Sequence, residues 1–496
     1  MTRRLLRCAR NVVTANEVKP SQCLRRSALT IFLIQKSKTT PHKAQSAVIL
    51  TLARQAHFYK VDTITETNAP LPAKNDRRII NGWAFFDWAN SAYALVITVA
   101  IFPGYFLAMT ADTVNILGMR MSDSTLYAWS ISLGYLVIAI LSPLLSGIAD
   151  YGGKKKAFMR FFTLLGSLAC ISLLFFTSMK TLWVGVTGFI LATIGFAGGI
   201  VFYNSFLPLI ATEDQYDRVS ARGFSYGFIG SIILLIINLV VIQNYQWFGF
   251  ENALLAVPTA FVMVGLWWLG FAQIPLNRLP EDRVTARQDN LLTKGYEEIR
   301  KVWRIVKQDR NTVLFLFAFF CYNAGVNAVL FLASTFAEKE LHFDTSGLIV
   351  LILVLQIVAI GGAWLSTRIS DRYGNKASII FQLVIWTIVC CAGYFIYSRL
   401  EFYILAAGVG LVMGGIQAIS RSTYAKFLPE NTPDTASFYS FYDVMDKVST
   451  VSGTFIFGFV EQLTGSMRNS VIALAVFFIL GLAVIGSVQV RRMKTG

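Results

Sequence analysis

Four charged residues lie inside long apolar stretches of the sequence, where an ion is costly. Asp87 lies about six residues, or ~9 Å of helix, into the first stretch. Asp443, Asp446 and Lys447 lie in the inner half of a later stretch, and Lys447 is the only one of the 44 Lys and Arg that we place well within such a stretch. A charge at mid-membrane needs a partner or water, so these residues are candidates for binding substrate charges or a coupling proton.

The spacing of these residues along the sequence predicts which of them can pair. Asp443 and Lys447 are four residues apart, share a helix face and can pair, whereas Asp446 points elsewhere, toward a cavity or the helix of Asp87. We hypothesise that Asp87, Asp446 and Lys447 form a site with both signs of charge, which suits a zwitterionic amino acid. The alternative is a structural charge pair that locks helices together.

Uncharged polar residues in other apolar stretches are candidates for hydrogen bonds to a substrate. They are Asn90, Tyr93, Asn204, Asn323, Asn327 and Gln417. Each one could equally hold two helices together, because polar side chains commonly bond across membrane helices.

The elements that must position these residues are membrane helices. The chain has 496 residues, 55% hydrophobic and only 15% charged, and its apolar stretches approach the ~20 residues that a span needs. We predict twelve spans near Trp83–Met109, Tyr127–Ala149, Phe158–Met179, Leu182–Ile210, Phe224–Gln243, Asn252–Gln273, Thr312–Ala337, Gly347–Ser366, Ala377–Tyr397, Phe402–Tyr424, Phe438–Val460 and Ser470–Val490.

Basic residues predict the orientation of these spans. One set of loops is rich in Lys and Arg, including the stretch from Pro275 to Asn311, and the opposite loops carry five. Positive loops favour the cytoplasm, so we expect both termini and this linker to be cytoplasmic, in a multi-pass protein of the plasma (inner) membrane. An amphipathic helix at Tyr296–Gln308 should lie at the membrane surface through Ile299, Val302, Trp303 and Val306.

Some functions lack their sequence signals. The net charge of +16 is spread over short loops, which argues against nucleic acid as a partner. The sequence has no Gly-x-x-x-x-Gly-Lys-Ser/Thr phosphate loop and no Gly-x-Ser-x-Gly nucleophile motif, and its six Cys and three His form no metal cluster. We therefore expect no cofactor and no enzyme. A membrane-embedded enzyme would need clustered His or carboxylates, and a receptor or scaffold would need soluble domains.

Two loops are copies of each other, 221 residues apart. Each carries Asp, Gly and Lys in the same order: Asp150, Gly153 and Lys155, then Asp371, Gly374 and Lys376. Phe-Leu-Pro ends the fourth and tenth spans with the same offset, at Pro208 and Pro429. Glycine permits the tight turn, and the Asp can accept bonds at a helix N-terminus. The repeat predicts two similar six-helix halves.

These loops resemble the signature loop of the major facilitator superfamily. The resemblance implies that Asp150 meets the start of the eleventh span and Asp371 the start of the fifth, as a latch that also includes Arg222 and Arg421. It also implies that spans one, four, seven and ten line a central cavity. Ser146 and Thr367 stand where the superfamily usually has Gly.

Longer strings resemble the vacuole-effluxer-like family of amino-acid effluxers. They are Asp87-Trp-Ala-Asn90-Ser, Arg222-Gly-Phe-Ser-Tyr226-Gly, Gln417-Ala-Ile-Ser-Arg421-Ser and Tyr442-Asp443-Val-Met-Asp446-Lys447. The seventh span departs from the pattern, with Ala324 before Gly325 where many relatives have an acid. The resemblance implies secondary or facilitative transport of a small solute, expected to be an amino acid, by alternating access, with H+ or Na+ as the coupling ion. Efflux of other organic solutes or drugs is the alternative.

The expected fold is all-α, with twelve membrane helices in two pseudo-symmetric bundles and a monomeric chain. Residues 1 to about 75 hold thirteen Lys or Arg against three acids. They are interpreted as a disordered tail, a targeting leader or translation from upstream of the true start. The predicted parts are a basic leader (1–78), a first bundle (79–274), a cytoplasmic linker (275–311) and a second bundle (312–496).

Overall fold

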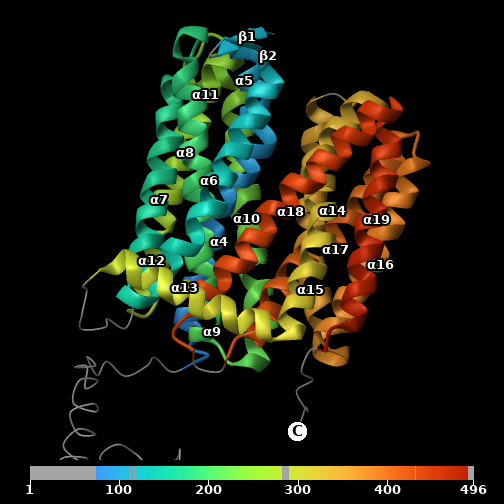
Figure 1. Cartoon of the computed structure of the whole chain (residues 1–496). Coiled ribbons are helices and arrows are strands. Elements are labelled where there is room, and N and C mark those ends of the chain that lie inside the picture. Colours follow the sequence, from blue (N-terminus) through green and yellow to red (C-terminus); the bar gives the residue numbers. More distant parts are fainter. Residues whose placement is uncertain are drawn as a thin grey trace, which may run out of the picture. The chain divides into compact units, whose positions relative to one another are not determined.

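The computed structural model describes residues 74–111, 113–116, 118–281, 290–343, 345–429 and 432–489. The leader expected at 1–78 lies almost wholly outside these residues. Two groups of long helices stand side by side (Figure 1). The predicted all-α, twelve-span fold is confirmed: each predicted span coincides with a helix or an unbroken series of helices.

The first bundle contains the six spans before the linker. Its elements are α4 (Arg77–Ala92), the π-helix η1 (Tyr93–Ile101), α5 (Phe102–Met109), α6 (Asp123–Gly152), α7 (Lys155–Ser172), α8 (Leu182–Ser205), α9 (Leu207–Ile210), α10 (Tyr216–Gln243), α11 (Ala253–Phe271) and α12 (Gln273–Arg278). A hairpin that was not predicted, β1 (Thr113–Ile116) and β2 (Met119–Ser122), follows α5. It pairs antiparallel, with Thr113 opposite Ser122.

The second bundle follows helix α13 (Leu291–Gln308). Its elements are α14 (Arg310–Leu341), α15 (Thr345–Tyr373), α16 (Asn375–Tyr394), α17 (Arg399–Phe427), α18 (Thr435–Thr464) and α19 (Met467–Ser487). Among the described residues, eleven segments are long and apolar enough to cross a membrane. Helix α18 is the span outside that count, and its apolar sequence is interrupted by Asp443, Asp446 and Lys447.

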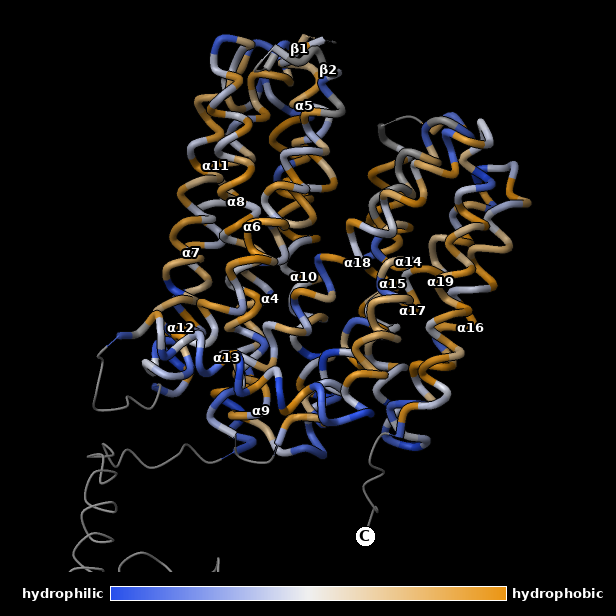
Figure 2. Tube along the Cα trace, viewed as in Figure 1, coloured by the Kyte–Doolittle hydropathy of each residue, from blue (hydrophilic) through white to orange (hydrophobic). Residues whose placement is uncertain are grey.

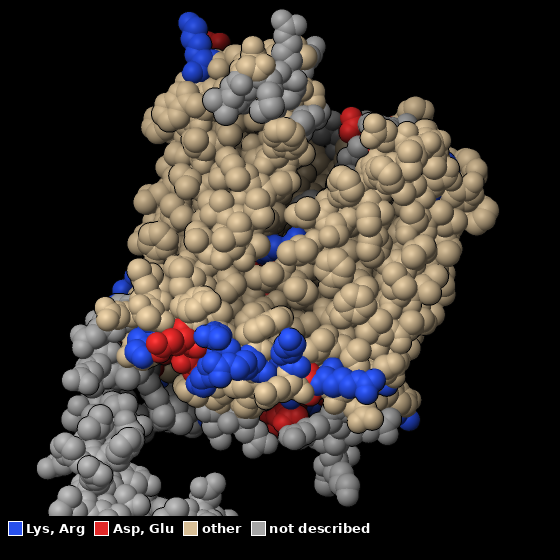
Figure 3. Space-filling model, viewed as in Figure 1, with Lys and Arg blue, Asp and Glu red and all other residues tan. Residues whose placement is uncertain are grey.

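The outer surface of both bundles is apolar, as a lipid-facing surface must be. Large hydrophobic side chains such as Ile140, Leu168 and Phe455 are exposed along the helices, and Figure 2 shows apolar residues along most of their length. Charged side chains gather in a band at one end, near α13 (Figure 3). We call this the linker end and the opposite one the far end. A helix with every backbone group paired suits this environment, so the chain is a multi-pass membrane protein.

Helix α13 packs across the linker end of both bundles. Its Gly295 lies against Ile148 of α6, and Lys301 bonds Asp434, just before α18, at 2.6 Å. Val302 and Val306 are buried in the protein, and Trp303 is half exposed, with its ring centre 5.4 Å from that of Phe441 of α18 in a tilted arrangement. The face that was predicted to lie at the membrane surface therefore packs in part on protein.

Glycines let neighbouring helices approach closely within each bundle. A Cβ added to Gly195 of α8 would lie 2.5 Å from the Cα of Gly166 on α7. In the second bundle, a Cβ at Gly410 of α17 would lie 2.6 Å from the Leu355 carbonyl oxygen of α15. These contacts are backbone against backbone, so no side chain can move aside to make room.

We expect Gly195→Ala to destabilise the protein by about 1–3 kcal/mol, because overpacking forces the two helices apart. The matched control is Gly361→Ala, where a Cβ meets nothing within 4 Å. The control should be neutral or slightly stabilising, since Ala favours a helix over Gly. Thermal unfolding in detergent measures both variants. Equal melting temperatures would contradict the close packing.

Candidate functional site

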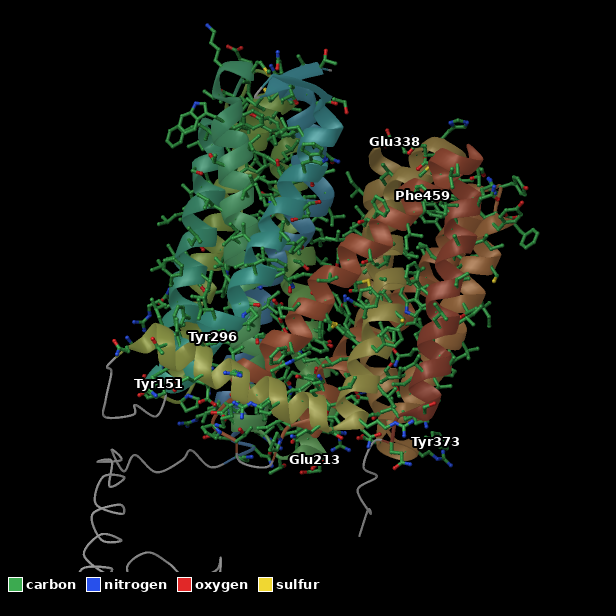
Figure 4. All side chains as sticks on the ribbon, viewed as in Figure 1. Tyr151, Glu213, Tyr296, Glu338, Tyr373 and Phe459 are labelled. Atoms are coloured by element: carbon green, nitrogen blue, oxygen red, sulfur yellow. The ribbon has the colours of Figure 1, made fainter. Side chains whose placement is uncertain are left out.

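A cavity of about 320 Å³ lies between the two bundles, within the usual range for small-molecule sites of about 300–1,000 Å³. Its walls come from α4, η1, α6, α8 and α10 on one side and from α14, α15, α17 and α18 on the other. Figure 3 shows the bundles parting toward the far end, with basic side chains visible in the hollow. Figure 4 places Glu338 and Phe459 at this far end, and Tyr296 and Glu213 at the linker end.

Most of the substrate-site candidates from the sequence line this one cavity. These eight residues are Asp87, Asn90, Asn204, Asn323, Asn327, Gln417, Asp446 and Lys447. Tyr93 is the exception: it is buried inside the first bundle, where its hydroxyl lies 2.8 Å from the Thr193 hydroxyl. At ~3.6 residues per turn, six residues carry Tyr93 about 240° around the helix from Asp87, away from the cavity.

A π-helix forms the cavity wall just after Asp87 and Asn90. Pro103 has no backbone N–H to bond the Val99 carbonyl, which interrupts the α-helical pattern in this span. The nine residues of η1 adopt the wider turn instead, and Leu95 and Thr98 of this segment line the cavity. Such segments are frequent at functional sites, because they re-aim side chains within a helix.

The partner of Asp87 is Arg421 of the other bundle. The Arg421 Nη1 lies 3.3 Å from Asp87 Oδ2, and both side chains are almost fully buried. The sequence hypothesis linked Asp87 to Asp446 and Lys447 and left Lys447 as the only cation well within a span. The second point is wrong, because Arg421 also lies within a span, on the inward face of α17 and six residues before that helix ends. The first stays a prediction: Asp87, Asp446 and Lys447 line one cavity, although Asp87 pairs with Arg421.

The first bundle surrounds the Arg421 guanidinium with acceptors and aromatic rings. Nε and Nη2 donate to the Ser220 hydroxyl and carbonyl at 2.9 and 2.8 Å, and Nη1 also donates to Asn204 Oδ1 at 3.3 Å. The Tyr203 hydroxyl donates to Asp87 Oδ2 at 2.7 Å. The guanidinium carbon lies 4.2 Å from the centre of the Phe224 ring. A guanidinium with this many partners tolerates burial, and it joins the bundles at the linker-end floor of the cavity.

Gly223 leaves the space for this ion pair. A Cβ at this position would lie 2.6 Å from Asp87 Oδ2 and 2.9 Å from Arg421 Nη2. Any larger residue would therefore push the two charges apart.

A second charge cluster lies on α18. Lys447 Nζ lies 3.0 Å from Asp443 Oδ1, as the four-residue spacing predicted, and 2.7 Å from Asp446 Oδ2. Asp446 therefore lines the cavity, as one of the two expected alternatives, and also shares the same ammonium, which was not expected. Asn323 Nδ2 of α14 donates to Asp446 Oδ1 at 2.8 Å. The ring of Tyr135, from the first bundle, lies 5.5 Å from the ammonium.

Asp150 connects the bundles at the linker end. Its carboxylate accepts from the backbone N–H groups of Ala436 and Ser437 at 3.2 and 2.6 Å, at the start of α18. Lys155 lies 2.9 Å from the same carboxylate and donates to the Pro433 carbonyl. Negative charge at a helix N-terminus is favourable. Gly153 turns the chain here with φ of +59°.

The second copy of the loop makes different contacts. Asp371 accepts from Arg218 Nη2 of α10 at 2.9 Å, at an exposed position, rather than from backbone N–H groups. The buried contact between bundles uses Asp217 instead, which accepts from Ser370, Asn375 and Lys426. Its signal in the sequence was an acid next to Arg218, just before the fifth predicted span, and the sequence analysis did not use it. Gly374 turns the chain with φ of +88°.

The other latch candidates remain within one bundle. Lys376 donates to the Gly486 carbonyl of α19, and Arg222 donates to Asn81 Oδ1 of α4. Within the part of the chain that the structure describes, four of the eight predicted latch residues bond to the other half: Asp150, Lys155, Asp371 and Arg421.

Two helical bundles around a central cavity are the architecture of the major facilitator superfamily. Solved structures share this fold: the outward conformation of the superfamily transporter FucP aligns with a TM-score of 0.62 at 15% identity, over 82% of this chain and 97% of that one. The human organic anion transporter MFSD10 aligns with a TM-score of 0.63 at 11% identity, over 82% and 99%.

The chain belongs to the Atg22-like vacuole effluxer family, whose model matches residues 75–495. It is 32% identical to an uncharacterized MFS-type transporter, YxiO, of Bacillus subtilis, over 82% of this chain and 94% of that protein. It is 26% identical to autophagy-related protein 22 of Kluyveromyces lactis, over 75% and 81%.

We expect Arg421→Gln to lower stability by about 3–5 kcal/mol, because it leaves the Asp87 carboxylate buried without its cation. Asp87→Asn should also destabilise, since it leaves the guanidinium uncompensated. The double variant should recover much of the loss, and the coupling energy follows from a double-mutant cycle of thermal unfolding. Strictly additive losses would show that the two charges do not interact.

We expect Asp150→Asn to favour opening of the linker end far more than Asp371→Asn does. A hydrogen bond to a charged group contributes about 1.5–3 kcal/mol, a roughly ten- to hundredfold change in equilibrium, whereas an exposed pair contributes about 0–1 kcal/mol. Labelling of a cysteine introduced at Ser437 measures opening. Equal labelling in the two variants would contradict this unequal latch.

Proposed function

We propose that this transporter moves an amino acid across the membrane by alternating access. The observation that supports this most is the cavity itself, which both bundles line and which carries side chains of both charge signs. Binding between two halves that can rock is how such transporters expose one site to each side in turn. The cavity volume of about 320 Å³ suits a solute of amino-acid size.

The contacts at the linker end hold that end closed. They support a transport cycle in which the far end is open first and the linker end opens afterwards. Arg421–Asp87, Asp150 with the start of α18, and Asp217 with Lys426 all join the two bundles there. The positive loops favour the cytoplasm for this end, so the structure would be an outward-facing state with both termini cytoplasmic. We place the protein in the plasma (inner) membrane as a monomer. H+ or Na+ is the proposed coupling ion.

The substrate class rests on the family and on the cavity together. The family model carries the description vacuole effluxer, and an amino acid presents one positive and one negative group. The Asp446 side chain is 31% exposed, more than that of Asp443 at 3% or Lys447 at 6%. A solute in the cavity would therefore meet Asp446 first.

Uptake of a labelled amino-acid mixture into proteoliposomes tests the proposal. Lys447→Gln should reduce the initial rate at least about tenfold, because it leaves two carboxylates without their shared cation at the site. Tyr93→Phe is the matched control: its hydroxyl bonds Thr193 away from the cavity, so uptake should stay near the wild-type rate. If the wild-type protein took up other organic solutes but no amino acid, the amino-acid substrate would be wrong.

A further inference from the structure

The charges that line the cavity do not balance. Among the described lining residues, three carboxylates, Asp87, Asp443 and Asp446, face two cations, Arg421 and Lys447. Arg421 is matched by Asp87, and Lys447 is shared by Asp443 and Asp446. One negative charge is therefore left over, and it lies in the α18 cluster. A carboxylate in a site of low dielectric favours a positive partner strongly.

The excess charge is accessible from the cavity through Asp446. The Asp446 side chain is 31% exposed, against 3% for Asp443, 6% for Lys447 and 10% for Asp87. Its two oxygens already hold the Lys447 ammonium and the Asn323 amide, and each oxygen can accept a further bond. Asp446 can therefore bind one more donor without releasing the groups that position it.

Buried hydrogen-bond acceptors without donors provide an independent observation. Asn90 lines the cavity and is only 1% exposed, and no described residue donates to its Oδ1. The Gln356 Oε1, on the α15 side of the cavity, is also buried without a donor among the described residues. Such groups are costly to leave unpaired, and a ligand that brings N–H groups would satisfy them.

Two other amides of the cavity wall, Asn323 and Asn327, use their donors within the protein. Asn323 donates its Nδ2 to Asp446 and to Ser449, and Asn327 donates its Nδ2 to Thr450, both along α18. Arg421 uses its donors on Ser220, Asn204 and Asp87. The donors of these three side chains are therefore used largely within the protein.

We propose that the cavity selects solutes with a net positive charge, such as a basic amino acid or a small amine, and that Asp446 binds their ammonium group. This inference rests on the proposed function as an amino-acid transporter and narrows its substrate class. A neutral amino acid would leave the excess carboxylate unmatched, and an acidic one would add a second negative charge. Asn90 and Gln356 would accept the remaining N–H groups.

A matched pair of amino acids tests the charge preference. L-lysine and L-norleucine have the same carbon chain and differ by the terminal ammonium. We expect the purified full-length protein to bind L-lysine about tenfold more tightly than L-norleucine by isothermal titration calorimetry, and L-glutamate more weakly than either; tenfold corresponds to one good interaction. Equal affinity for lysine and norleucine would overturn the proposal while leaving amino-acid transport intact.

Asp446→Asn identifies the residue responsible, because it removes the excess charge and keeps an oxygen for Asn323. The lysine preference should fall to within about twofold, since no uncompensated charge remains. Glu338→Gln is the control: it removes one charge from an exposed position at the far end of α14, outside the cavity lining (Figure 4), and should keep the preference. A preference that survives Asp446→Asn would overturn the assignment.

Two further measurements make each result decisive. Asp446→Glu restores the charge, so recovery of the preference shows that the loss was not misfolding, and absence of recovery in a folded variant counts against Asp446. Cadaverine, a diamine without a carboxylate, separates the two proposals. Binding of cadaverine without any amino acid would support the charge preference and contradict amino-acid transport, and no binding of any probe would contradict both.

Discussion

The contact on which this structure depends is the buried ion pair between Arg421 and Asp87, at 3.3 Å. Neither charge is tolerable alone at this depth, and each comes from a different bundle, so the cost of an unpaired ion holds the bundles together. Ser220, Asn204 and Tyr203 complete the hydrogen bonds. The pair is also reversible, because two ions can separate wherever water or another charge replaces the partner.

The two duplicated loops make different contacts with the opposite bundle. In the first copy Asp150 binds the α18 N-terminus directly and is buried with Lys155. In the second copy Asp371 holds only Arg218 at the surface, and Asp217 on the facing helix carries the buried contact. The buried carboxylate of this second junction therefore comes from the first bundle, at Asp217, and not from the loop of the second bundle. One junction therefore depends on a helix terminus and the other on a network of side chains, so the two need not open together.

The sequence was sufficient for the spans, the repeat and most cavity residues, because apolar length and spacing are local properties. It could not show that Arg421, which the sequence groups with basic loop residues, reaches into the other bundle. That contact depends on the space at Gly223 and on acceptors far away in the chain, such as Ser220 at a separation of 201 residues. Tyr93 was misplaced because sharing a helix is not sharing a face. The hairpin and the π-helix depend on backbone hydrogen bonding, which hydropathy does not predict.

The two charge clusters of the cavity have different roles. The Arg421–Asp87 pair is neutral and joins the bundles, whereas the α18 cluster keeps an unmatched carboxylate within one bundle. Arg421 and Asp87 come from different bundles, so a movement that opened the linker end would separate them and leave a second carboxylate unmatched beside the cavity. A cation already held at Asp446 would lower the cost of that separation. The same excess charge that attracts a positive solute would then couple its binding to the movement of the bundles.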